Sequence, residues 1–365
     1  MRRVFGAVAL ALGVTLLVLG AVSRPLIYDE LATVSLDQRS TSVSEGQNMA
    51  TLRVWSDDEG KSHFDQLTDV TVRSTRQVVG IPGMVPEDEL DTTAVWQTGV
   101  TSEAVGIGAL TYSEELVTFD RKTGLTTGDD RDVRSAGDLD DPDKMVPVTH
   151  EGLFYKFPFA VEKTTYPWWD GDLAQPVDIS FVREEELYGT NTYVFQQVIP
   201  PTEVPPARTV PAAVFGGTGA DVQATVSYGN TRTLWIEPNT GVIIKGQEQV
   251  DKALISTTGT VATTKGTIGY SDQTVRDNAE TWGSKGRLLG FLGGPFMWVG
   301  IISGLLLITV GALLIGRRPT STSTDGTPAR RSRGRAQAPE GVQGIDGLGV
   351  GGSGDTHTRR ERAGA

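Results

Sequence analysis

The acidic run DDRDVRSAGDLDDPD (129–143) offers the most obvious coordination chemistry in the sequence. Four of its aspartates lie within six residues: Asp138, Asp140, Asp141 and Asp143. Carboxylate oxygens are the ligands that Ca²⁺ prefers, but the run lacks the glycine and the terminal glutamate that an EF-hand loop needs at fixed positions. We therefore expect a solvated acidic loop without a resident metal.

Nucleophilic and redox chemistry lack their usual residues. The sequence has no cysteine, which excludes thiolate nucleophiles, Cys-built zinc sites and disulfides. Its three histidines, His63, His150 and His357, stand in loop-like or tail settings that form a poor basis for a catalytic triad or a metal site. No G-x-S-x-G, H-E-x-x-H or P-loop pattern occurs. We expect a protein that is not an enzyme and carries no cofactor.

The residues best suited to binding lie in and beside an aromatic stretch, KFPFAVEKTTYPWWD (156–170). The candidate ligand-binding residues are Phe154, Phe157, Phe159, Tyr166, Trp168, Trp169 and Asp170. The rings carry large apolar areas, and the prolines beside them keep the segment extended and out of a helix. One interpretation is the central core of the domain. The other is an apolar groove for a lipid or sugar of the cell envelope, with Asp170 either guiding the ligand at its mouth or serving as a turn acceptor before Gly171.

Two apolar segments must hold this domain in place. Residues 4–22 follow two arginines, contain no charge and approach the ~20 residues needed to cross a bilayer. They predict a transmembrane signal anchor, with a cleaved signal peptide as the alternative. Residues 288–316 predict an interfacial segment followed by a second transmembrane helix, which spans the membrane from around Phe296 to Ile315.

Positive charge orients both helices. The basic residues at both ends predict a cytoplasmic N-terminus at residues 1–3 and a disordered, basic cytoplasmic tail at residues 317–365. The domain at residues 23–287 is then extracellular, and the chain is a two-pass protein of the plasma membrane. Small residues that let two helices approach closely occur in both segments: Gly6, Gly13, Gly300 and Gly304.

Short runs rich in β-branched and aromatic residues dominate residues 25–286. The long helices of βαβ crossovers are missing, so the sequence predicts a mainly β protein with a large antiparallel sheet or barrel-like domain. The stretches FDRKTGL (119–125) and IEPNTGV (236–242) share an acidic residue that opens a turn and a Thr-Gly that closes it, which predicts two hairpin tips. The proline-dense stretch 200–213 predicts an extended surface connection.

Charge is unevenly distributed along the chain. The formal net charge is −12, but residues 25–286 hold 40 acidic against 20 basic side chains. An acidic domain between basic ends disfavours nucleic acid as a partner and suits a membrane protein.

Four stretches resemble signature sequences of a known family: TFDRKTG, GLFYKFPFAVEKTTYPWWD, LYGTNTYVFQQVIP and TLWIEPNTGVIIKG. They are similar to the PorA-type porin family of actinobacterial envelope proteins, which is widely catalogued as a domain of unknown function. The resemblance covers most of the chain and implies an envelope protein with a channel role. The layout is also similar to that of class B scavenger receptors, whose ectodomain is tunnelled for lipid and which, unlike this chain, have disulfides.

The function that we predict is that of a membrane-anchored cell-envelope protein whose β-rich domain binds or conducts an apolar envelope molecule. The alternatives are a porin-like channel subunit, which the family resemblance implies, and a non-catalytic interaction module. Two helices do not enclose a pore, so a channel would need a homo-oligomer or a domain that acts as a conduit. The expected partners are membrane lipids and an envelope lipid or glycolipid.

Overall fold

The computed structural model of the chain describes residues 1–136 and 144–316. The aspartates at 138–143 and the expected tail at 317–365 lie outside the described residues. The strands are β1 (Arg39–Ser56), β2 (Ser62–Gly80), β3 (Thr93–Ala104), β4 (Gly108–Asp120), β5 (Val133–Ser135), β6 (Met145–Pro147), β7 (Thr165–Asp170), β8 (Gln175–Leu187), β9 (Thr190–Val210), β10 (Val222–Ile236), β11 (Ile243–Ser256) and β12 (Gly259–Tyr270). The α-helices are α1 (Arg2–Val22), α2 (Asp29–Leu31), α3 (Asp272–Gly293) and α4 (Pro295–Gly316).

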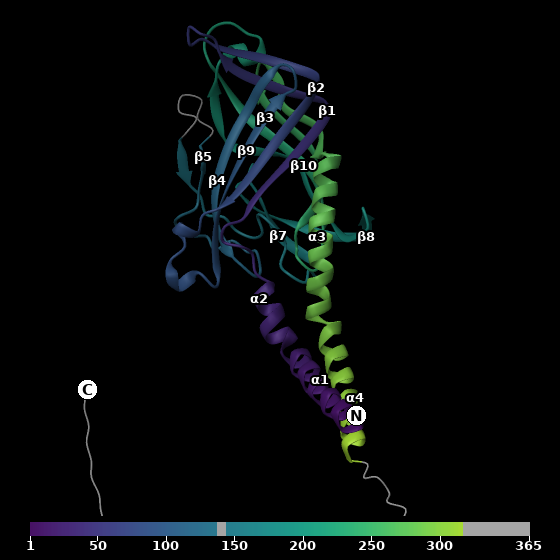
Figure 1. Cartoon of the computed structure of the whole chain (residues 1–365). Helices are drawn as coiled ribbons and strands as arrows, with labels where there is room; N and C mark the ends of the chain where they lie inside the picture. The colour runs from purple at the N-terminus through teal and green to yellow at the C-terminus, as the bar shows by residue number, and fades with distance from the viewer. Residues whose placement is uncertain (137–143, 317–365) are drawn as a thin grey trace, which may run out of the picture. The chain divides into compact units, whose positions relative to one another are not determined.

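All twelve strands form one antiparallel sheet (Figure 1) in the order β6-β5-β4-β3-β2-β1-β12-β11-β10-β9-β8-β7. Except for β6 and β7, which lie at the two edges, strands that follow one another in the chain are neighbours in the sheet, as expected when short turns connect them. The first and last strands pair at the centre, where Ser44 lies opposite Tyr270. The expectation of a mainly β, antiparallel domain is confirmed, and the sheet is not closed into a barrel.

The two halves of the sheet are linked across the open side by a short segment around Leu153. Leu153 forms an antiparallel bridge with Leu125, just after β4, and a parallel bridge with Trp168 on β7. Its backbone N–H donates to the carbonyl of Pro167 at 2.8 Å, and its own carbonyl accepts from the N–H of Trp169 at 2.8 Å. The curled sheet therefore surrounds an interior although β6 and β7 do not pair.

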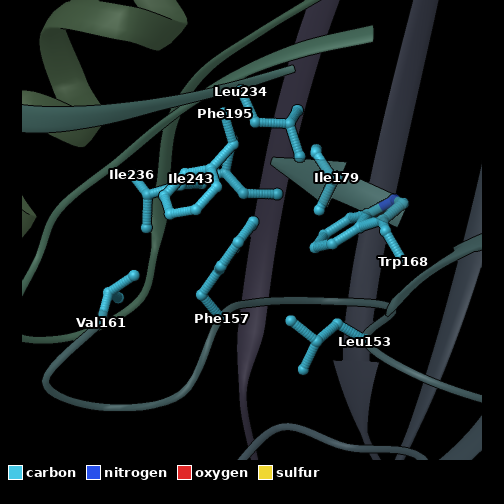
Figure 2. Close-up of a cluster of buried hydrophobic side chains, with 9 residues drawn as sticks. All are labelled: Leu153, Phe157, Val161, Trp168, Ile179, Phe195, Leu234, Ile236 and Ile243. Atoms are coloured by element: carbon cyan, nitrogen blue, oxygen red, sulfur yellow. The ribbon is translucent and has the colours of Figure 1, made fainter. Parts of the chain in front are cut away.

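A cluster of buried apolar side chains fills one end of this interior (Figure 2). Phe157 is fully buried at its centre, stacked on Trp168 with ring centroids 5.3 Å apart and 4.6 Å from the ring of Phe195. The other members are Leu153, Val161, Ile179, Leu234, Ile236 and Ile243. These residues come from segments far apart in the chain, so their burial joins β7–β11 to the aromatic stretch.

Two turns of the same design hold the aromatic stretch. Asp120 accepts from the backbone N–H groups of the turn that it opens, and Gly124 closes this turn with φ +75°. Glu237 and Gly241 (φ +73°) repeat the arrangement between β10 and β11. The carbonyl of Gly241 accepts from the N–H of Phe157 at 2.8 Å. A Cβ on Gly241 would lie 2.1 Å from the carbonyl oxygen of Phe157, so this turn requires glycine for space as well as for its backbone angle.

Both terminal apolar helices are long and apolar enough to span a membrane, at Arg2–Leu31 and Pro295–Gly316. The first helix continues past α1 through a π-helical turn (Ser23–Tyr28) into α2. α1 and α4 lie side by side (Figure 1) along a seam of glycines. A Cβ added to Gly13 would lie 2.7 Å from the carbonyl oxygen of Gly304, which shows how closely the backbones approach. Equivalent approaches link Gly6 with Gly311 and Gly20 with Gly300.

Two segments differ from the expectation. Residues 200–210, within the stretch read as a surface connection, continue β9 and pair with β10. The prolines fit because the register between β9 and β10 shifts there, so not every N–H is needed in the ladder. Residues 288–293 belong to α3, which begins at the N-cap Ser271 and ends before Pro295. α3 packs on the sheet through Val275 and Ala279.

Candidate functional site

The structure contains two adjoining cavities. One lies inside the curled sheet, and the other lies between the sheet and α3. The sheet-interior cavity, about 350 Å³, is lined by β1–β4, β7 and β10–β12. The helix-side cavity, about 440 Å³, lies between β1–β3, the 236–242 turn, Leu31 and α3. Four residues line both cavities: Ser42, Arg76, Ile243 and Tyr270. These four residues form a wall that the two cavities share.

One wall of the sheet-interior cavity, formed by β1–β3, is polar because alternate strand residues face the same side, whereas Trp168, Trp169 and Leu234 make other parts of the lining apolar. Ser42 and Ser44 on β1 lie opposite Arg76 and Ser74 on β2, and all four side chains face this cavity. Thr98 on β3 continues the row and accepts a hydrogen bond from Nε of Arg76 at 3.0 Å. A concave sheet face of hydroxyl and charged groups offers hydrogen bonds to a polar ligand or to water.

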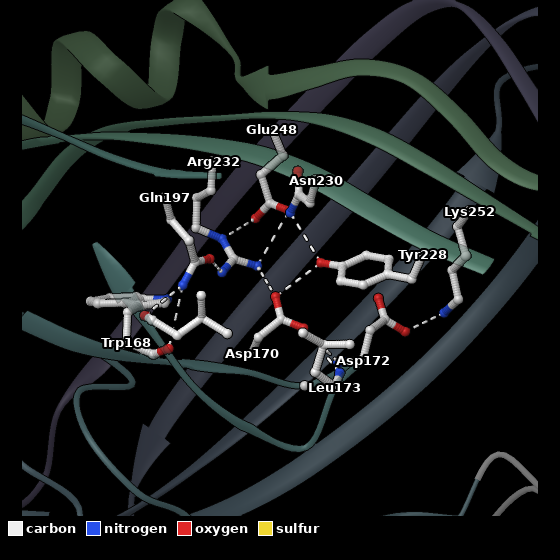
Figure 3. A network of polar contacts seen from close by, with 12 residues as sticks. Trp168, Asp170, Asp172, Leu173, Gln197, Tyr228, Asn230, Arg232, Glu248 and Lys252 are labelled. Carbon is white, nitrogen blue, oxygen red and sulfur yellow. Dashed lines mark hydrogen bonds and ion pairs between the residues drawn. The ribbon is translucent and has the colours of Figure 1, made fainter. Parts of the chain in front are cut away.

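A buried ionic network closes one side of this cavity (Figure 3). Arg232 donates from Nε to Oε1 of Glu248 at 3.0 Å, and its Nη2 lies 3.3 Å from Oδ2 of Asp170. Glu248 faces the cavity and keeps 36% of its side chain accessible, whereas Asp170 is fully buried. Desolvation opposes ionisation of Glu248, but the charge and hydrogen bonds of Arg232 together hold its carboxyl pKa below the usual value.

Asp170 combines a turn role with an ion-pair role. Its Oδ1 accepts from the backbone N–H groups of Asp172 and Leu173, at 3.2 and 3.0 Å. Its Oδ2 accepts from the hydroxyl of Tyr228 at 2.9 Å and faces Arg232. The turn acceptor considered from the sequence is present, but the carboxylate is fully enclosed and does not stand at a cavity mouth.

A second buried cluster surrounds His150, beside the sheet-interior cavity. Its Nδ1 lies 2.8 Å from Oδ2 of Asp132, and its Nε2 lies 3.0 Å from Oε2 of Glu115, which lines the cavity. Burial opposes protonation, but the hydrogen bonds and charges of the two carboxylates raise the pKa of His150. Within the described ranges, no group of His, Asp and Glu is placed to hold a metal ion.

The helix-side cavity has a different character. Its apolar wall includes Leu288, Leu289 and Leu292 on α3, which lead toward Pro295 at the start of α4. Its charged groups are Lys156 and two further cations, Arg76 and Lys285. None of the described residues that line it is Asp or Glu.

Lys156 is the most unusual residue of this wall. Only 4% of it is exposed, and its Nζ has no hydrogen-bond partner among the described residues. The ammonium lies 3.6 Å from the ring centroid of Phe159, close enough for a cation–π interaction. Burial lowers the pKa of Lys156 to about 7, an effect that the charge of Asp120 only partly opposes.

The structure divides the seven candidate residues among four places. Phe154, Trp168 and Trp169 line the sheet-interior cavity, and Phe159 lines the helix-side cavity. Phe157 lies in the apolar core with Tyr166 packed against it, and Asp170 lies in the ionic network. The aromatic stretch thus contributes to core and cavity walls alike. The indole N–H of Trp169 is buried without a hydrogen-bond partner in the described part of the chain.

The sequence reasoning missed Lys156 and Arg232. Lys156 opens the quoted stretch KFPF, and a lysine set among aromatic residues was a signal that could have marked it as buried. Arg232 lies 62 positions after Asp170, in a strand without unusual sequence features, so no local pattern predicts their contact.

Comparison with known proteins gives a consistent picture. A family model described as Porin PorA matches residues 5–313. A protein described as Porin PorA from Corynebacterium amycolatum is 24% identical over 303 residues, covering 68% of this chain and 78% of that protein. Another with the same description, from Corynebacterium resistens, is 26% identical over 187 residues, covering 37% of this chain and 45% of that protein. The family expected from the four sequence stretches is confirmed, and the chain belongs to the PorA porin family.

Proposed function

We propose that this protein is a non-catalytic, membrane-tethered envelope protein that binds an amphiphilic molecule in its two adjoining cavities. The apolar part of the ligand occupies the helix-side cavity along the leucines of α3. Its polar part enters the sheet-interior cavity. The observation that carries the proposal is the shared wall of the two cavities, with the leucines of α3 in one cavity and a row of hydroxyl and charged groups on β1–β3 in the other.

The terminal helices support a tether to the membrane. Most of the apolar side chains of α1 and α4 are exposed, which an aqueous environment would strongly disfavour. The glycine seam pairs the two helices, so both would enter the bilayer together. Leu292 of the helix-side cavity lies three positions before Pro295, so this cavity would open near the membrane surface. Membrane lipids are then the nearest source of an amphiphile.

The proposal is tested by native mass spectrometry of the full-length protein after exposure to monoolein, a neutral amphiphile. The wild type should retain one bound molecule. Ser42→Trp fills the wall between the cavities and should reduce the occupancy at least about tenfold, because overpacking removes the space for the ligand. Ser180→Trp, at an exposed serine that lines neither cavity, is the matched control. A wild type without bound monoolein, or a Ser42→Trp variant that binds normally, would contradict the proposal.

A porin-like channel is the second candidate. The relatives are described as porins, and the wall of the sheet-interior cavity carries the hydroxyl and charged groups that suit a water-filled passage. Two helices enclose no pore, so conductance through the membrane would require several copies of the chain.

The channel candidate predicts discrete conductance steps for the full-length protein in planar bilayers. Arg76→Glu reverses one charge in the wall shared by both cavities and should shift the ion selectivity toward cations. A preparation that gives no steps, under conditions in which a known porin inserts, would argue against this candidate and leave amphiphile binding unaffected.

A further inference from the structure

The charge of the helix-side cavity is opposite to that of the domain that contains it. Residues 25–286 carry twice as many acidic as basic side chains. The described lining of this cavity nevertheless contains three cations and no carboxylate. The cations come from three separate elements: Arg76 from β2, Lys156 from the aromatic stretch and Lys285 from α3. Their convergence is a tertiary feature that an acidic composition does not explain.

None of the three cations is neutralised by an ion pair within the described residues. Arg76 donates to the neutral hydroxyl of Thr98, and its guanidinium lies 5.6 Å from the ring centroids of Phe154 and Tyr155. Lys285 lies 4.3 Å from the ring centroid of Trp282. Aromatic faces stabilise cations but leave their hydrogen-bonding capacity free for an anion.

The burial of Lys156 is the second and independent observation. A buried ammonium without a partner is costly, and proteins usually pair such a group or avoid it. Lys156 is held in this position by the two turns around it. The N–H of Phe157 donates to Gly241, and the carbonyl of Lys156 lies 3.0 Å from the place where a Cβ on Gly124 would stand. The fold therefore keeps the ammonium in the cavity wall although its Nζ has no hydrogen-bond partner among the described residues and the charge of Asp120 offsets its burial only in part.

We propose that the helix-side cavity binds an anionic amphiphile, whose charged head group pairs with Lys156 and Arg76 while its acyl chain lies along the leucines of α3. This inference rests on the proposed function and adds the charge of the ligand to it. A volume of about 440 Å³ lies within the range of sites that take small organic ligands. Its leucines lead toward Pro295 at the start of α4, which is the direction in which a longer acyl chain would extend.

The experiment compares cis-parinaric acid with its uncharged methyl ester in equilibrium titrations of the full-length protein in non-ionic detergent. The wild type should bind the acid at least about tenfold more tightly than the ester, because charge-assisted hydrogen bonds are among the strongest polar contacts. Lys156→Met keeps the length and removes the charge, so the affinity for the acid should fall toward that for the ester and most of the preference should be lost. Lys265→Met, at an exposed lysine paired with Asp251, should behave as the wild type.

The melting temperature of the ligand-free protein distinguishes a ligand-binding role of Lys156 from a purely structural role. Removal of an unpaired buried charge should raise the melting temperature of Lys156→Met, whereas loss of a residue needed for folding would lower it. Lys285→Met changes an exposed side chain of the same cavity and should reduce the acid preference about threefold. Competition with oleate and with oleoyl lysophosphatidate then identifies the head group as a carboxylate or a phosphate. Displacement by neither would contradict the proposal.

The outcomes distinguish this inference from the function on which it rests. If the wild type binds acid and ester equally, and Lys156→Met changes neither affinity, the charge assignment is wrong while amphiphile binding stands. If the wild type binds neither probe, the proposed function fails with it.

Discussion

The two cavities share a wall but differ in whether their buried charges are paired. In the sheet-interior cavity, Arg232 is surrounded by Glu248 and Asp170, and every member of the network has a charged or polar partner. In the helix-side cavity, Lys156 is almost completely buried beside an aromatic ring without any such partner among the described residues. The same domain thus contains a paired set of buried charges on its strands and an unpaired buried charge at Lys156, between β6 and β7.

This difference separates charges that hold the fold from charges that are available to a ligand. A paired buried charge is costly to disturb, because removal of one partner leaves the other uncompensated. An unpaired buried charge already carries that cost in the folded state. Substitutions should therefore have opposite signs in the two cavities: loss of stability at Asp170 and gain of stability at Lys156.

The largest effect is expected for Asp170→Asn. The amide can still accept from the backbone N–H of Leu173, but it no longer compensates Arg232. We expect a loss of about 3 kcal/mol in the free energy of unfolding, measured by denaturant titration of the full-length protein in detergent. Asp172→Asn is the matched control, since Asp172 pairs with Lys252 at the surface, and its loss should cost at most about 1 kcal/mol. Equal losses in the free energy of unfolding for the two variants would contradict the distinction between a buried and a surface ion pair.

A smaller effect of opposite sign is expected for Lys156→Met. At pH 6 both the folded and the unfolded chain hold the proton on Lys156, so the full burial cost applies and its removal should stabilise the protein by about 2 kcal/mol. Between pH 7 and pH 10.5 the unfolded chain keeps a proton that the folded chain has released, so stability from this position rises with pH. The gain from the substitution should therefore shrink when melting temperatures are compared at pH 6 and pH 9.

The smallest effect concerns His150, beside the sheet-interior cavity. Its folded pKa is raised above 6.5 by Asp132 and Glu115, so its stabilising contribution is complete below the unfolded pKa and is lost as the pH rises through the folded value. His150 and Lys156 thus impose opposite pH slopes on stability. His150→Gln should remove this loss of stability with rising pH. The measurement is the change in melting temperature between pH 6 and pH 8, compared between the variant and the wild type. An unchanged slope would show that the histidine is not protonated in the folded state.

Local signals explain why much of the fold could be predicted. Two long apolar segments, alternating strands and the turn frame from Asp120 to Gly124 depend on neighbouring residues, so they can be read from the sequence directly. The length of α3 escaped prediction because its glycines lower helix propensity. In the structure those glycines allow close packing: a Cβ on Gly286 would lie 2.1 Å from the carboxyl carbon of Glu237.

The candidate site was predicted only in part, because aromatic type alone does not tell a core residue from a cavity wall. Phe157 and Phe159 are two positions apart and have similar sequence surroundings. One lies in the centre of the apolar core, and the other faces the helix-side cavity beneath the ammonium of Lys156. Which neighbours meet each ring is decided by the two turns and by α3, which arrive from distant parts of the chain.

The sequence by itself determined the two apolar helices, the antiparallel β domain between them and the hairpin tips, because each follows from period, hydropathy or backbone preference within a short window. Only the tertiary structure decided which charges are paired. Asp170 and Arg232 meet because β7 and β10 belong to one curled sheet. Among the described residues, Lys156 has no hydrogen-bond partner, and none of those that line the cavity between that sheet and α3 is Asp or Glu. The energy of a charge depends on burial and on neighbours brought from far along the chain, and neither is written in the local sequence.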